Sequence, residues 1–285
     1  MINGTRYRLS TEIHRQQRLA TDIAHAQAQI STRKRLQAPS DNPPDAAQIA
    51  RITRSLGNEA AWTQNITAAS TLASRGDEAL RTLASGYDRA LELMLNASTG
   101  TASAENRETI AVELRSLADE VRSLRDSADG RGGKLFSTGE PVAIPIGESL
   151  EVAPVNSRAA VFDTVVTPSG TTDLAAILDA AVAAITNPDD AARAAAIETS
   201  LAAVTAATDH IANMRGDQGI RGARIDSAGE RLAASTLTLK EEFTSFSETD
   251  IVEVTAQLNS KQLSLEAAQA VFARLNQNSL FDLLL

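Results

Sequence analysis

The chain has 285 residues, of which 43% are hydrophobic and 22% charged, and it carries a net charge of −9. It is long enough to bury a core as one or two domains. Only 3% of the residues are aromatic, whereas alanine takes roughly fifty positions, which favours closely packed helices over an enzyme pocket lined with rings. The absence of cysteine excludes disulfides and thiolate sites, and the negative charge argues against nucleic acid as a partner.

Prolines divide the chain into segments, because proline is excluded from helix interiors. All eight lie near residues 39–44, at 141–168 or at Pro188. The intervening stretches, 45–140 and 189–285, are free to form long helices. No stretch is apolar enough to span a bilayer, and the arginine-rich start does not resemble a signal peptide, so we expect no membrane insertion.

The first segment, residues 2–30, is predicted to be an amphipathic helix. Ile13, Ile23 and Ile30 fall on a seam with the alternating three- and four-residue spacing of a coiled coil. About half of this seam is polar, as at Gln16 and Gln27. Such a helix buries little alone, so we expect it to need a partner helix.

The middle of the chain is predicted to hold further helices and one β-rich excursion. A helix should start at Ser40 or Asp41, and another at Asn187–Asp190, where an amide, a proline and two acids form a start signal. Residues 141–168 instead contain alternating and β-branched residues between prolines, including Val161–Val166, which predicts short edge strands or extended pieces. Apolar stripes at helical spacing run through 80–94, 110–124 and 197–211.

The last segment is predicted to be a second seam-forming helix. Upstream of Asp250 the apolar positions lie one residue out of register with those that follow, which indicates a break at Ser247–Asp250. With the first helix, this segment supplies the predicted assembly interface: Ile13, Ile23, Ile30, Ile251, Val254, Leu258, Leu265, Phe272 and Leu275.

These patterns predict a mainly α fold: an elongated helical bundle or coiled-coil rod with a small β-rich insertion, whose terminal helices form a coiled coil on assembly. We expect an N-terminal helix and connecting loop (1–44), the first half of a rod (45–140), the insertion (141–171), the second half of the rod (172–249) and a C-terminal helix (250–285).

No pattern points to catalysis. The three histidines, at positions 14, 25 and 210, have no partner at metal-ligand spacing, and no phosphate loop, nucleophile elbow or dinucleotide motif occurs. We therefore assign no catalytic, cofactor or metal residue. The carboxylate pairs 41/45 and 189/190 lie where helix starts favour acids.

Two stretches resemble the axial proteins of the bacterial flagellin superfamily. The run from Gln29 to Ala47, QISTRKRLQAPSDNPPDAA, resembles the signature that links the N-terminal helix of these proteins to their body. Residues 258–284 are similar to their C-terminal helix. Within the superfamily, Pro39–Pro43 and the ending at 279–283, SLFDL, resemble the hook-associated proteins of the hook–filament junction more than flagellin. Arg33 stands where the signature usually has glycine, so the turn there can differ.

The resemblance implies a structural, non-enzymatic role in the bacterial flagellum. It implies self-assembly into a ring beside another hook-associated protein and flagellin, after export through the flagellar type III apparatus with an export chaperone. It also implies an extracellular location reached without a cleaved signal peptide, with terminal helices that order on assembly. Flagellin itself is the alternative, and a soluble coiled-coil scaffold is a third reading; an enzyme or sugar-binding module at 133–170 fits least well, since that region lacks clustered acids and aromatics.

Overall fold

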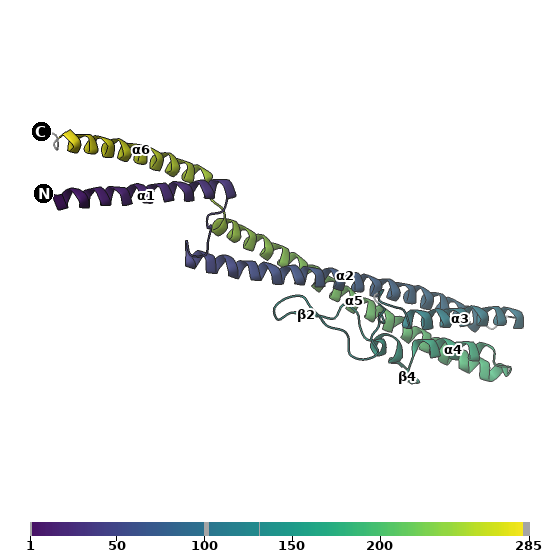
Figure 1. The fold of residues 1–285 in the computed structure, drawn as a ribbon. Helices are drawn as coiled ribbons and strands as arrows, with labels where there is room; N and C mark the ends of the chain where they lie inside the picture. Colours follow the sequence, from purple (N-terminus) through teal and green to yellow (C-terminus); the bar gives the residue numbers. More distant parts are fainter. Residues whose placement is uncertain (1, 100–102, 131, 282–285) are drawn as a thin grey trace. The chain divides into compact units, whose positions relative to one another are not determined.

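A computed structural model describes residues 2–99, 103–130 and 132–281, with side chains described between residues 10 and 274 of these ranges. The chain is mainly α-helical with two small sheets (Figure 1), which confirms the predicted fold class. The elements follow in the order α1 (Ile2–Thr32), α2 (Pro43–Ser98), α3 (Ala104–Arg125), β1 (Ile144–Pro145), β2 (Glu151–Val152), the π-helical turn η1 (Ala159–Asp163), β3 (Val165–Thr167), β4 (Gly170–Thr172), α4 (Leu174–Ile185), α5 (Asp190–Ser247) and α6 (Ile251–Phe281). None of the described helices combines the length and apolar character needed to cross a membrane.

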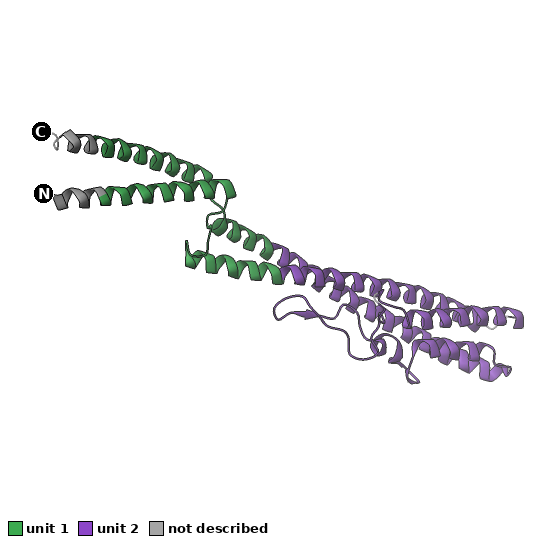
Figure 2. Cartoon of the chain, in the orientation of Figure 1, with its two compact units in different colours: residues 1–58, 235–285 green, residues 59–234 purple. Residues whose placement is uncertain are grey.

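Two compact units make up the chain (Figure 2). Unit 1 contains residues 1–58 and 235–285, and unit 2 contains residues 59–234. The long helices α2 and α5 contribute to both units. Unit 1 is built from two segments of the chain, whereas unit 2 is one continuous stretch. The boundaries between the units lie within α2 and α5.

The core of unit 2 is built from the predicted apolar stripes. Leu80, Leu83, Tyr87 and Met94 of α2 are buried, and they pack with buried residues of α3, α4 and α5 in one cluster. The Tyr87 hydroxyl donates a hydrogen bond to the Leu174 carbonyl at the start of α4. The stripe positions that are only partly buried pack against this cluster: Leu91, Ile110, Leu117, Leu124 and Leu201.

The helix starts lie near their predicted places, but other side chains cap them. Asn42, rather than Ser40 or Asp41, accepts a hydrogen bond from the Asp45 amide at the start of α2, with N and Oδ1 3.4 Å apart. At the start of α5, Asp189 accepts from the amides of residues 191 and 192 at 2.9 and 3.2 Å. Both satisfy amides that would otherwise lack a partner in the first turn.

The β-rich region forms two separate antiparallel pairs, β1 with β2 and β3 with β4. The expectation that 161–166 is extended throughout is wrong, because Val161 and Phe162 lie in η1. Both side chains are buried, and the Phe162 ring meets Phe136 edge to face at 5.0 Å. In a strand, two successive side chains would point to opposite faces. In the helical turn, the side chains of Val161 and Phe162 both point toward the core.

Candidate assembly interface

The terminal helices α1 and α6 pack along one another within unit 1 (Figure 1). On α6 the covered positions coincide with the predicted seam, through Val254, Leu258, Leu265 and Phe272, which are half-buried. Ala268 on α6 and Ala26 on α1 are the buried residues of the two helices within the described side chains.

The covered face of α1 has the alternating three- and four-residue spacing that was predicted, but it is rotated relative to the predicted seam. Ile23 and Ile30 belong to both, whereas Ile13 does not. The covered or half-buried positions that follow this spacing are Glu12, Gln16, Leu19, Ile23, Ala26 and Ile30, and Ala28 and Gln29 near the end of the helix are half-buried as well. Ile13 is exposed, as is Ile251 at the start of α6, and the side chain of Leu275 lies outside the described residues. The shift has a geometric cause. Rotating α1 about its own axis by a few tens of degrees replaces one position of the seam by its neighbour in the sequence. In this structure α6 covers the side of α1 that carries Ala26.

Polar groups make the helix pair weak. Lys261 on α6 forms an ion pair with Asp22 on α1, with Nζ and Oδ2 3.2 Å apart; both side chains are partly exposed, and such pairs contribute about 1 kcal/mol or less. The Gln16 amide nitrogen is buried without a hydrogen-bond partner, which costs about 1–3 kcal/mol. The pair is therefore held by few fully buried contacts.

A second apolar face of α6 lies opposite the face that α1 covers. At 100° per residue, Val252, Ala256, Leu263, Ala267 and Ala270 share one side of the helix, and all five are exposed. Leu263 is 68% exposed. We call these five residues the outer face of α6. This face is absent from the sequence predictions, although the helical spacing of its five apolar residues signals a second stripe on the same helix.

The joint of unit 1 is the place where the chain passes from α1 to α2 and from α5 to α6. The two connections pair antiparallel at Lys34 and Glu248. The Arg35 amide donates to the Ser247 carbonyl at 2.8 Å, and the Thr249 amide donates to the Arg33 carbonyl at 3.2 Å. These bonds hold the ends of α1 and α6 together, so both helices leave the joint side by side.

Side chains brace the same joint. The Arg35 guanidinium donates to the Ser245 carbonyl at 3.3 Å and pairs with the Asp45 carboxylate. The Asp41 carboxylate accepts from the amides of Gln37 and Ala38, both at 2.8 Å, and lies 3.5 Å from His25 Nε2. The amides of Ala38 and Gln37, with His25, lower the pKa of Asp41 below its ordinary value of 3.8, since each stabilises the ionised carboxylate.

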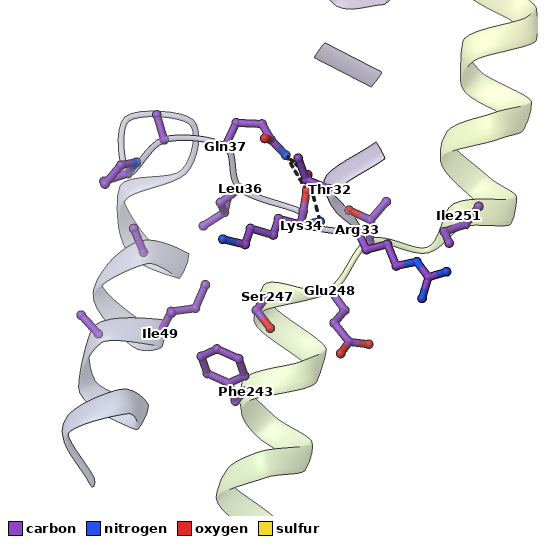
Figure 3. Close-up of a pocket in the computed structure, with 15 residues that line it drawn as sticks. Thr32, Arg33, Lys34, Leu36, Gln37, Ile49, Phe243, Ser247, Glu248 and Ile251 are labelled. Atoms are coloured by element: carbon purple, nitrogen blue, oxygen red, sulfur yellow. Dashed lines mark hydrogen bonds between the residues drawn. The ribbon is translucent and has the colours of Figure 1, made fainter. Parts of the chain in front are cut away.

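A groove of about 690 Å³ opens at the joint. Leu36 from the loop, Ile49 from α2 and Phe243 from α5 point toward one another along it (Figure 3). The Lys34 side chain extends toward Leu36, whereas Glu248 points away from this cluster. Its lining combines apolar side chains with polar and charged ones, including Lys34, Gln37 and Glu248. No group of three or more metal-ligating side chains occurs among the residues that the structure describes.

Arg33 has a backbone φ of +58°, in the left-handed region that glycine adopts without strain. The turn therefore keeps the geometry that glycine would favour. A side chain in this region costs about 1 kcal/mol. Replacing Arg33 by glycine should thus stabilise the joint by about 1 kcal/mol relative to Arg33→Ala, which retains the Cβ atom. Hydrogen exchange at the Arg35 amide should slow about fivefold in the glycine variant; equal exchange in the two variants would show that the turn stores no strain.

Comparison with known proteins agrees with this architecture. Residues 7–140 match the bacterial flagellin N-terminal helical region, and residues 201–284 match the bacterial flagellin C-terminal helical region. Flagellar hook-associated protein 3 of Escherichia coli (strain K12) is 24% identical over an alignment of 315 positions, which covers 97% of this chain and 99% of that protein.

Solved structures share the fold. A putative flagellar hook-associated protein from Vibrio parahaemolyticus superposes with a TM-score of 0.65 at 16% identity, covering 73% of this chain and 100% of that one. The flagellar junction protein FlgL from Legionella pneumophila superposes with a TM-score of 0.57 at 15% identity, covering 71% of this chain and 100% of that one. Since the two flagellin regions together match about three quarters of the sequence, this chain belongs to the bacterial flagellin family.

Proposed function

We propose that this chain is a structural subunit of the bacterial flagellum that forms the junction between hook and filament. Its copies assemble there through α1 and α6, with the predicted seam residues and the outer face of α6 buried between helices. The role is structural rather than enzymatic.

The observation that carries this proposal is the outer face of α6. Within one chain α1 covers only the opposite side of α6, and the outer face, with Leu263, stays exposed. A helix that is apolar on two sides needs a partner on each. Helices of neighbouring copies are the natural partners in a protein of this family, because every copy carries the same unfilled surface.

The likeness over almost the whole length supports the junction role over that of the filament subunit. The E. coli relative matched over 97% of this chain is a hook-associated protein, and the Legionella protein of the same fold is a flagellar junction protein. By this reasoning the partners are further copies in a ring, a second hook-associated protein on one side and flagellin on the other.

The same proposal includes a route of export from the cell. The subunit leaves the cell through the flagellar type III export apparatus, attended by an export chaperone, and without a cleaved signal peptide. The weak α1–α6 pair suits this route, since helices held by few buried contacts separate at low cost and become fully ordered when neighbours cover them.

Deletion of the gene tests the junction role. We expect cells that keep their hooks, lose their filaments and shed unattached filament protein into the medium, and we expect the wild-type gene to restore attached filaments. Electron microscopy of the cells and immunoblotting of the medium measure both. Complete loss of filament protein would instead identify the chain as flagellin, and filaments that remain attached would contradict a role in the flagellar axis.

A further inference from the structure

A basic groove lies beside the β1–β2 hairpin in unit 2. It has a volume of about 590 Å³ and is lined by residues 146 and 150–153 and by α5 between residues 220 and 231. Ile220 and Leu150 line it and are 56% and 45% exposed. Three arginines and one glutamate line it, for a net charge of +2: Arg221, Arg224, Arg231 and Glu151. We call it the hairpin groove.

Two of these arginines are available to a partner. Arg221 is held in place, because its guanidinium donates to Asp217 at 2.9 Å and to the Ala153 carbonyl at 2.9 Å. Arg224 and Arg231 are exposed and form no ion pair within the part of the chain that the structure describes. The groove thus combines uncovered apolar side chains with a net positive charge in a chain whose net charge is −9.

An acidic groove lies between α2 and α5 in the same unit. It has a volume of about 490 Å³ and a net charge of −2 from four charged lining residues: Asp77, Glu78, Asp226 and Arg81. Asp77 and Glu78 form ion pairs with Arg81 of their own helix, at 2.7 and 3.4 Å. Gly219 and Gly222 line its α5 wall, and a Cβ atom added at either would meet open space. A neighbouring surface can therefore approach the backbone closely there.

The two grooves lie on opposite sides of the same stretch of α5. The hairpin groove takes Ile220, Arg224 and Arg231 from this stretch; the acidic groove takes Gly222 and Asp226. At 100° per residue the mean directions of the two sets differ by about half a turn. One copy therefore presents positive charge on one side and negative charge on the other, at the same level of the helix.

We propose that the hairpin groove of one copy docks against the acidic groove of the next, so that unit 2 supplies a second assembly contact besides the terminal helices. This inference rests on the proposed self-assembly and names the surfaces that it uses. Arg224 and Arg231 meet Glu78 and Asp226 of the neighbour, while Ile220 and Leu150 cover the open wall at the two glycines. A contact between two different surfaces of identical copies repeats from each copy to the next, and the charges fix which side meets which.

Charge reversal tests the contact in cells that lack the native gene. The full chain is supplied with Arg224→Glu and Arg231→Glu, with Glu78→Lys and Asp226→Lys, or with all four changes. Each two-site variant should melt like the wild type, be exported, and be retained on flagella about tenfold less or worse, because like charges then face each other. The four-site variant should recover retention, since its two grooves are again complementary. Glu120→Lys, an exposed change on α3, is the control and should be retained normally.

Cross-linking supplies an independent measurement, because the native chain contains no cysteine. Two variants, Arg224→Cys and Glu78→Cys, are produced in the same cells, and their isolated flagella are mildly oxidised. Disulfide dimers that join one variant to the other should then greatly exceed dimers of either variant with itself. Three outcomes would each overturn the proposal. They are normal retention of both two-site variants, failure of the four-site variant to recover retention, and the absence of mixed dimers. The deletion strain distinguishes failure of this contact from failure of the proposed function. Attached filaments in the deletion strain would refute the junction role. Detached filaments in that strain, together with full retention of the charge-reversed variants, would refute only this contact.

Discussion

Replacing Leu263 by aspartate should abolish incorporation into flagella while leaving the free subunit as stable as the wild type. Leu263 is 68% exposed on the outer face of α6, so its replacement removes almost no intrachain packing. The free energy of unfolding should change by less than about 0.5 kcal/mol, as for other exposed positions. In the assembly, however, the new carboxylate would be buried without a partner, which costs about 3 kcal/mol or more and lowers the assembly constant by roughly 100-fold or more.

Thermal unfolding of the purified full chain and immunoblotting of isolated flagella measure the two effects separately. Ser264→Asp is the matched control: it adds the same charge at the next exposed residue of α6, turned about 100° away from the outer face, and should be incorporated. The predicted seam residues Leu265 and Phe272 serve less well, since they are half-buried against α1 and their replacement would disturb both states. Normal incorporation of Leu263→Asp would show that no neighbour covers the outer face.

Replacing Leu114 by aspartate should unfold unit 2. Leu114 is 0% exposed within the main core cluster, among residues of α2, α3 and α4. A charged group there loses its hydration without gaining a partner, and the packing of the leucine is lost as well. The expected loss, about 5 kcal/mol, approaches the whole stability of many domains.

Urea unfolding of the full chain, followed by circular dichroism, measures this loss. Leu114→Ala should give a graded decrease of about 3 kcal/mol. Val112→Asp is the control on the same helix, because Val112 is 56% exposed; it should shift the stability by less than about 0.5 kcal/mol. Equal midpoints for Leu114→Asp and Val112→Asp would refute the core assignment of α3.

Much of the helical framework follows from local sequence. Prolines are confined to residues 39–44, 141–168 and 188. The long helix α2 begins at Pro43 and continues into the proline-free stretch that follows, and α5 lies in the proline-free stretch after Pro188. The phase slip at Ser247–Asp250 lies where α5 ends and α6 begins. These features are predictable because proline and apolar spacing act within one or two helical turns.

Other features depend on residues far apart in the sequence. The π-helical turn at 159–163 replaces part of an expected strand because Val161 and Phe162 both reach the core. The left-handed conformation of Arg33 occurs next to the hydrogen bonds that join residues 33–35 to 247–249. Nothing in the local pattern around either segment specifies these partners.

The sequence alone determined that the fold is mainly helical with apolar seams at both ends, because helical periodicity places residues on a common face whatever the rest of the chain does. The motifs at residues 29–47 and 258–284 separately gave the resemblance to the axial proteins. Only the tertiary structure decided which face of each helix is already covered. It buried Ala26 on α1 and left Ile13 and Leu263 exposed, and it set the basic and acidic grooves on opposite sides of α5. Periodicity defines the faces of a helix, but the partner that buries a face is chosen by contacts between distant segments.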